Sequence, residues 1–175
     1  ARATHIYTQP DFKSPERTSL SIGSHVRVLR EEGRFAKLPE GFVPLEHLSD
    51  LTPEADPVSV AERLVGTPYL WGGNSAFGID CSGLVSIGCA ACGIACMGDS
   101  DMQEAAFADA QGGYQRGDLL FWKGHVAWVA DSETLLHANA YHMAVAYEPI
   151  EAAIARIEAQ GDGAVTAHKR IGATT

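Results

Sequence analysis

The feature that most constrains the fold is a change in hydrophobic pattern near residues 49–57. Before this stretch, short segments alternate polar and apolar residues and are separated by turn residues. After it, helix-like segments come first and strand-like segments follow. Because alternation favours half-buried strands and a spacing of three and four favours helices, the chain of 175 residues is expected to contain two parts of different structural class.

The first part is expected to be all-β. Turn residues at regular spacing separate its candidate strands, which is typical of a small barrel. The candidate strands are residues 4–8, 25–30, 34–38 and 42–45.

The second part is expected to be α+β, with helices first and an antiparallel meander after them. We assign 1–50 and 51–175 to separate domains, with 51–57 as the linker. Asp56 is expected to cap a helix that has Pro57 at its first position. Further helices are expected at Cys81, at a Ser100–Gln103 capping box and at 149–159; strands are expected at 118–122, 125–130, 134–137, 143–147 and 164–171.

Charge excludes several classes of partner. The formal net charge is −9, and all of it lies in residues 53–175, which hold six basic and fifteen acidic side chains. A duplex-binding domain needs a basic face, and an anionic membrane surface attracts basic segments, so we expect neither nucleic acid nor membrane as a partner. The uncharged run 81–98 contains four glycines and is expected to be a buried helix followed by a loop.

The four cysteines fall into two groups. Cys89, Cys92 and Cys96 share one face of the expected helix, which favours three small buried side chains. A zinc site would need a second pair of ligands, and no His or Cys pair with ligand spacing follows in the sequence. Cys81 stands at the expected start of that helix, where the helix dipole favours a thiolate. We therefore expect a depressed pKa and a fast reaction with iodoacetamide at Cys81.

Two histidines strengthen the case for Cys81. His125 begins one expected strand and His137 ends the next, so a hairpin would bring the two imidazoles together. A thiol nucleophile, a base and a group that orients the base are the parts that covalent catalysis needs. Asn139 is the alternative orienting group, and His142 is expected to be structural.

Four motifs in this order resemble one known family. They are Leu64-Val-Gly-Thr-Pro-Tyr-Leu-Trp-Gly-Gly73, Asp80-Cys-Ser-Gly-Leu-Val85, Gly117-Asp-Leu-Leu-Phe-Trp122 before His125, and Leu136-His-Ala138. Together they resemble the NlpC/P60 cysteine peptidases. Residues 1–50 resemble a bacterial SH3 domain, and the pair is most similar to the YkfC-type γ-D-glutamyl-L-diamino acid endopeptidases of murein peptide recycling.

The resemblance implies a papain-like catalytic domain preceded by a small SH3-like barrel. It implies a Cys-His-His triad of Cys81, His125 and His137, and it requires no cofactor or metal. It also implies substrate contacts at Tyr69, Asp80, Ser82 and Ser100. From the residues alone, Asp80 has two candidate roles: it binds a substrate amine, or it caps the helix of Cys81.

The expected substrate is a short murein peptide of the L-Ala-γ-D-Glu-diamino acid type with a free N-terminus. The alternatives are an exported peptidoglycan hydrolase, or a related amidase or acyltransferase that uses the same site. A recycling enzyme would meet free peptides in the cytoplasm, and four cysteines arranged as one plus three suit a reducing compartment. A wall hydrolase would instead be exported. The diamino acid and the oligomeric state do not follow from the sequence.

Overall fold

The structure is a computed structural model that describes residues 1–172. The chain divides into two compact units, one from Ala1 to Thr52 and one that begins at Pro53. Each unit has its own core and is described separately. None of the helices in the described part of the chain has the length and apolar character that crossing a membrane requires.

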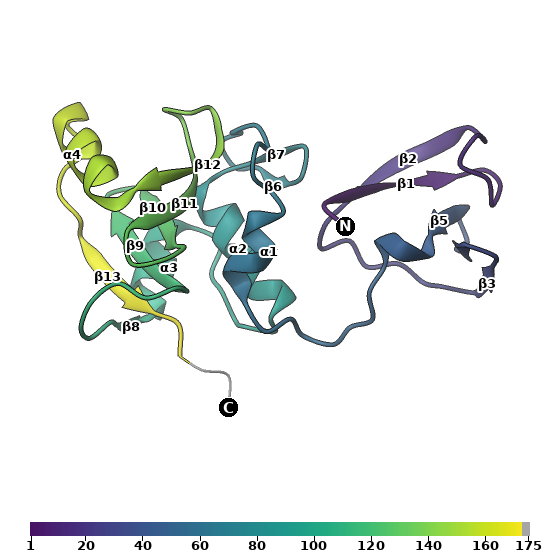
Figure 1. The fold of residues 1–175 in the computed structure, drawn as a ribbon, viewed down its shortest axis with the longest axis horizontal. Helices are drawn as coiled ribbons and strands as arrows, with labels where there is room; N and C mark the ends of the chain where they lie inside the picture. Colours follow the sequence, from purple (N-terminus) through teal and green to yellow (C-terminus); the bar gives the residue numbers. More distant parts are fainter. Residues whose placement is uncertain (173–175) are drawn as a thin grey trace. The chain divides into compact units, whose positions relative to one another are not determined.

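The first unit is a five-stranded antiparallel sheet, drawn in purple to blue in Figure 1. Its strands pair in the order β2-β1-β5-β4-β3. Ile6, Ala36, Leu38 and Val43 form its buried core. The elements are β1 (Ala3–Tyr7), β2 (Glu16–Ser21), β3 (Arg30–Glu32), β4 (Phe35–Lys37), β5 (Phe42–Pro44) and the 3₁₀ helix η1 (Leu45–His47).

Two expectations for this unit are wrong. The partner of β1 is β2, because a turn over residues 8–15 folds the chain straight back onto β1, and residues 25–29 form no strand. Arg30, the last residue of the expected strand over 25–30, is instead the first residue of β3. Among residues 1–172, β2 and β3 stand at opposite ends of the sheet and do not pair, so the sheet is open and no closed barrel is found.

The second unit is α+β, as expected. Its six-stranded sheet has the order β12-β11-β10-β9-β13-β8, and β9 to β12 form the expected antiparallel meander. The elements are α1 (Pro57–Glu62), β6 (Asn74–Ser75), β7 (Gly78–Ile79), α2 (Cys81–Ala91), α3 (Ser100–Ala106), β8 (Ala108–Asp109), β9 (Asp118–Trp122), β10 (His125–Val129), β11 (Thr134–Asn139), β12 (Ala144–Pro149), α4 (Ile150–Gln160) and β13 (Ala167–Arg170).

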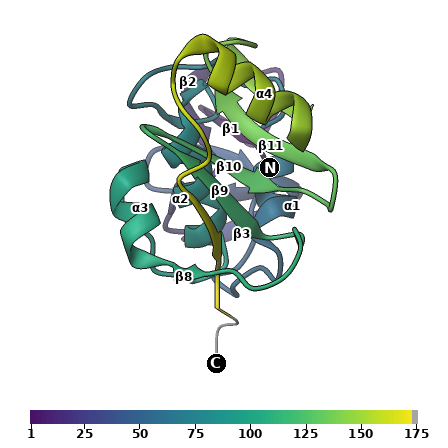
Figure 2. The same cartoon turned by 90° about the vertical axis from the view of Figure 1, so that its left-hand side faces the viewer.

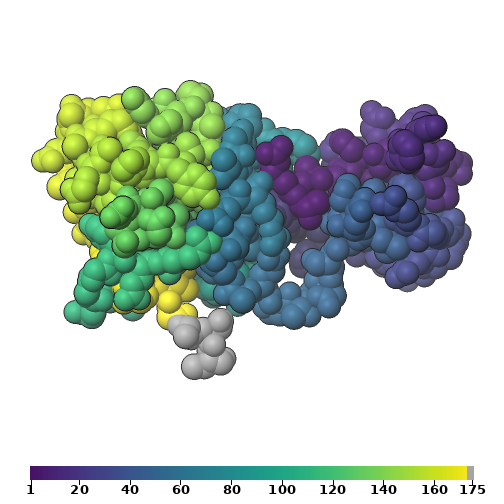
Figure 3. Space-filling view, viewed as in Figure 1, coloured from purple at the N-terminus to yellow at the C-terminus, as the bar shows by residue number. Residues whose placement is uncertain are grey.

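Helices cover both faces of this sheet (Figures 1 and 2). The amphipathic helix α4 buries Ile150, Ala153 and Ile157 against Trp122 and Val129 of the sheet. In the space-filling view, α4 and the β11–β12 segment form one continuous surface, coloured yellow to green (Figure 3). Helices α1 and α2 pack on β10 and β11 from the other side.

Gly88 explains why α2 carries a weak helix former at its middle. A Cβ at this position would lie 2.8 Å from the carbonyl oxygen of Pro57 and 3.2 Å from the indole of Trp128. The absence of a side chain lets α2 lie close to both α1 and β10. The conformational cost of glycine in a helix is thus offset by tight packing.

Helices α1, α2 and α3 begin at Pro57, Cys81 and Ser100, as expected, but only part of the expected capping chemistry is present. Asp56 caps α1, accepting a hydrogen bond of 2.9 Å from the N–H of Val58. The expected capping box of α3 is wrong: Asp99 is the cap residue and makes no side-chain cap bond. Gln103 is instead fully buried, and its amide donates to the Ser82 carbonyl because α3 packs on α2.

The expectation that three cysteines share one face of a helix is also wrong in part. Helix α2 ends at Ala91, and Gly93 turns the chain with a φ of 68°. Cys89 and Cys92 are buried as expected, whereas Cys96 lies beyond the helix and is partly exposed.

Candidate active site

Asp80 organises the start of α2. Its Oδ1 accepts hydrogen bonds from the N–H of Gly83 at 2.7 Å and the hydroxyl of Ser82 at 3.2 Å. Its Oδ2 accepts a bond of 2.8 Å from the N–H of Gly72. Of the two roles that the sequence left open, the structure displays the helix cap, and the same carboxylate also ties the preceding loop to the helix.

That loop lies directly on the first turn of α2. A Cβ on Gly83 would overlap the carbonyl oxygen of Gly73, so only glycine permits this approach. The loop brings Tyr69 near Cys81 and Asp80: burial, followed by the charges of these two residues, raises the pKa of the Tyr69 phenol.

Cys81 is the first residue of α2, and it is 7% exposed. Its sulfur accepts a hydrogen bond from the backbone N–H of Val126, the residue that follows His125 in β10. Burial raises the pKa of this thiol, and the nearby charge of Asp80 acts in the same direction. The expected depressed pKa is therefore wrong, because desolvation of the thiolate outweighs hydrogen bonds from the helix N-terminus.

The two histidines meet as the hairpin predicts. Strands β10 and β11 pair with Trp128 opposite Leu136, and Nε2 of His125 lies 2.9 Å from Nδ1 of His137. Burial, and then the neighbouring charge of His137, lowers the pKa of His125 to about 3. Both the imidazole and the thiol are therefore neutral at neutral pH, and a base and a nucleophile stand on adjoining elements.

The chain of hydrogen bonds continues beyond the two histidines. Nε2 of His137 lies 3.0 Å from Oε2 of Glu148 on β12, and the Arg156 guanidinium on α4 holds the same carboxylate. Glu148 and Arg156 are not among the residues that the sequence predicts for the site. No motif marks them, because a strand and a helix are brought together only by the packing of α4 on the sheet.

The remaining candidates lie in different surroundings. Ser82 is buried and bonded to Asp80, and Ser100 is the first residue of α3. Asn139 accepts a bond of 3.0 Å from the ring of His142, so it does not replace His137 as the partner of His125.

One cluster has the donor types of a metal site. A nitrogen from each of His137 and His142 and an oxygen of Glu148 lie within 4.8 Å of one another. The guanidinium of Arg156, however, donates to both oxygens of Glu148, at 2.9 and 2.7 Å. A second cation at this carboxylate would face that charge, so the residues fit an ion pair better than a metal.

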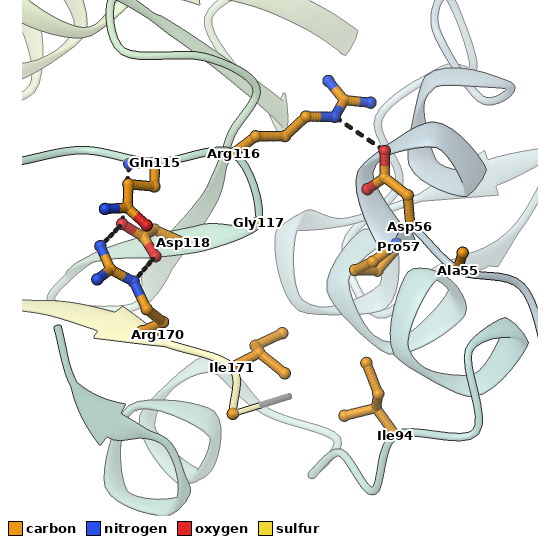
Figure 4. A pocket seen from close by; sticks show the side chains of 11 residues that line it. Ala55, Asp56, Pro57, Ile94, Gln115, Arg116, Gly117, Asp118, Arg170 and Ile171 are labelled. Atoms are coloured by element: carbon orange, nitrogen blue, oxygen red, sulfur yellow. Dashed lines mark hydrogen bonds and ion pairs between the residues drawn. The ribbon is translucent and has the colours of Figure 1, made fainter. Parts of the chain in front are cut away.

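A pocket of about 380 Å³ lies elsewhere in the second unit (Figure 4). The charged side chains that line it form ion pairs with one another: Arg116 pairs with Asp56, and Arg170 pairs with Asp118. Because neither Cys81 nor the two histidines line it, this pocket is not the site of the expected chemistry.

The thiol environments predict which cysteine reacts first. The hydrogen bond with Cys89 lowers the pKa of Cys96 to about 7, whereas burial raises that of Cys81. Near pH 7, iodoacetamide should therefore label Cys96 faster than Cys81, which reverses the order expected from the sequence. Peptide mapping of alkylation rates from pH 6 to 10 measures this order. A faster Cys81 near pH 7 would contradict it.

The comparisons with known proteins agree with this geometry. The NlpC/P60 family model matches residues 66–158. The chain is 39% identical over 87 residues to dipeptidyl-peptidase 6 of Lysinibacillus sphaericus, covering 47% of this chain and 31% of that protein. It is 32% identical over 109 residues to the gamma-D-glutamyl-L-lysine dipeptidyl-peptidase of Bacillus cereus, covering 57% of this chain and 33% of that protein.

A similar solved structure covers both units. It is the crystal structure of an NlpC/P60 family protein from Bacillus cereus, with a TM-score of 0.73 and 22% sequence identity. The alignment covers 97% of this chain and 63% of that one. The chain thus spans about a third of the length of the curated relatives that it matches.

Proposed function

Because the chain belongs to the NlpC/P60 family, we propose that it is a cysteine peptidase that hydrolyses the γ-D-Glu–diamino acid bond of short murein peptides. The substrate has a free N-terminal L-Ala. A relative named as a gamma-D-glutamyl-L-lysine dipeptidyl-peptidase supports this substrate class. Family membership and the dipeptidyl-peptidase relatives are consistent with a cysteine hydrolase.

The observation that carries the proposal is the placement of a buried thiol beside the strand of a paired imidazole. The Cys81 sulfur lies against the backbone of Val126, and the adjacent His125 is held by His137 at 2.9 Å. A nucleophile, a base and an orienting group come from α2, β10 and β11, three elements that pack against one another in the second unit.

The proposed reaction begins from the neutral pair. His125 takes the proton of Cys81 as the sulfur attacks the γ-carbonyl carbon of D-Glu, and the carbonyl oxygen becomes an oxyanion. The backbone N–H of Cys81, at the start of α2, is the proposed donor to that oxyanion. The diamino acid amine leaves with the proton from His125, and water then hydrolyses the thioester and restores the thiol.

The free amine has a candidate partner in Asp80. Oδ2 of Asp80 accepts one hydrogen bond, from Gly72, and a carboxylate oxygen has two acceptor positions. Asp80 is thus able to cap α2 and still accept a substrate ammonium, with the phenol of Tyr69 nearby. The net charge of −9, all of it in residues 53–175, also favours the binding of a cationic substrate group such as this ammonium.

The proposal extends to the first unit and to the compartment. The five-stranded antiparallel sheet of residues 1–52 is proposed to be SH3-like, as the sequence resemblance of residues 1–50 implies. Recycling acts on loose peptides, which places the proposed enzyme in the cytoplasm. An exported wall hydrolase is the competing reading, and the substrate experiment below separates the two.

Blocking the substrate amine is expected to cause a large loss of activity. Acetylation of the N-terminus of L-Ala-γ-D-Glu-diamino acid should lower kcat/KM by roughly 30-fold to several thousand-fold, because it leaves the partly buried carboxylate of Asp80 without its ionic partner. Hydrolysis of the free and the acetylated tripeptide, followed by mass spectrometry, measures the ratio.

Asp80→Asn is the matched variant, because asparagine also caps helices but carries no charge. This variant should lose most of the preference for the free amine while retaining hydrolysis of the acetylated peptide. Comparable cleavage of both peptides by the unaltered enzyme, or efficient lysis of whole sacculi, would instead favour the wall hydrolase.

A further inference from the structure

We infer that Glu148 is a positioning residue that sets the proton positions on both imidazoles and thereby leaves Nδ1 of His125 free to accept the Cys81 proton. The catalytic consequence rests on the proposed function, whereas the proton positions are a property of the resting protein. Glu148 lies at the other end of this hydrogen-bonded chain from His125.

Glu148 is able only to accept hydrogen bonds. The residue is 7% exposed, and Arg156 donates to its Oε1 at 2.9 Å and to its Oε2 at 2.7 Å. Although burial acts to raise it, the hydrogen bonds from Arg156 and His137 lower the pKa of Glu148 to about 2. At neutral pH this side chain is a carboxylate and has no proton to donate.

The proton positions then follow one from another. Nε2 of His137, at 3.0 Å from an acceptor, must carry a proton and donate it to Glu148. Burial lowers the pKa of His137, so the ring is neutral and its Nδ1 has a lone pair. That Nδ1 accepts from Nε2 of His125 at 2.9 Å, which leaves Nδ1 as the unprotonated nitrogen of His125.

The packing around Glu148 holds the carboxylate in this orientation. The Arg156 guanidinium lies over the ring of Tyr141 at 4.5 Å and donates to Gln160 at 2.9 Å. The other charged or titratable ring nearby, His142, is hydrogen-bonded to Asn139, and its ring centre lies 6.4 Å from that of His137. The acceptor therefore has little freedom to rotate away.

The chain contains a second trio of the same chemistry that serves as a control. Asp118 accepts from His168 at 2.8 Å and from Arg170 at 2.6 and 2.7 Å. It is 1% exposed and lies on the β9–β13 pair, where no histidine of the hydrogen-bonded chain takes part. Asp118→Asn thus removes a buried carboxylate between a histidine and an arginine without changing the hydrogen-bonded chain from His125 to Glu148.

The direct test uses the unaltered protein with ¹⁵N-labelled histidine. Two-bond ¹⁵N–¹H NMR correlations are expected to show the Nε2–H tautomer for both His125 and His137. An Nδ1–H tautomer at His125 would overturn the inference. No substrate is needed, so this result stands apart from the success or failure of the proposed function.

Glu148→Gln tests the consequence. Its amide is able to donate as well as accept, so the tautomers of His137 and His125 should become mixed or reversed. With the murein tripeptide, kcat should fall roughly 10²–10⁴-fold, as expected when the group that fixes the tautomer of a catalytic histidine is lost, while KM changes little. Glu148→Asp, which keeps an acceptor-only group, should recover part of kcat.

Asp118→Asn should change thermal stability by an amount comparable to Glu148→Gln and leave both tautomers and kcat unchanged. An equal loss of kcat in the two variants would show that Glu148 acts through stability alone and would overturn the inference. If Glu148→Gln fails to fold, the tautomers of the unaltered protein and of Glu148→Asp still decide the question.

Discussion

Replacing Cys81 with alanine is expected to lower kcat/KM for the murein tripeptide by at least about 10³-fold. Alanine removes the sulfur that forms the thioester, and the oxyanion donor and the binding groups alone retain only a small part of the catalysis. Because the side chain is 7% exposed and packs beside Val126, the smaller residue should leave the fold intact. Steady-state hydrolysis followed by mass spectrometry measures the loss.

Cys92→Ala is the matched control for that variant. Cys92 is also buried, at 6% exposed, but it lies at the other end of α2 and outside the hydrogen-bonded chain of histidines. It should therefore keep activity close to that of the unaltered protein. If Cys81→Ala retained comparable activity with an unchanged circular dichroism spectrum, the nucleophile would be another group and the proposed mechanism would be wrong.

Replacing His125 with alanine is expected to lower kcat roughly 10²–10⁴-fold, the range that general acid–base catalysis supplies. Without the imidazole, a thiol whose pKa is raised by burial has no base beside it, and the leaving amine receives no proton. The loss should shrink at high pH, where hydroxide competes as the base. A kcat profile from pH 6 to 10 measures both effects.

His142→Ala controls for the removal of an imidazole from the same region. His142 is exposed and bonded to Asn139, and it is not a member of the chain from His125 to Glu148. Its variant should stay within a few-fold of the unaltered kcat. Equal losses in the two histidine variants would remove His125 from the role of base.

The sequence alone determined the class of the second unit and the elements that carry Cys81, His125 and His137. Periodicity predicts the meander from Asp118 onward, and the capping chemistry of Asp56 and Asp80 predicts where α1 and α2 begin. These predictions succeed because alternation and caps are local: they depend on residues within a few positions of one another. The contact between His125 and His137 is local in the same sense, because the two strands that carry them are consecutive and pair as a hairpin.

Only the tertiary structure decided the electrostatics of the site. The helix N-terminus alone favours a thiolate at Cys81 and so a lowered pKa, yet burial raises the pKa of this thiol. The strand at Glu16–Ser21 and the open sheet also escaped prediction, since long-range strand pairing overrides local alternation. Glu148 and Arg156 lie on a strand and on a helix that packs across it, so no spacing in the sequence marks the carboxylate that orients the histidines.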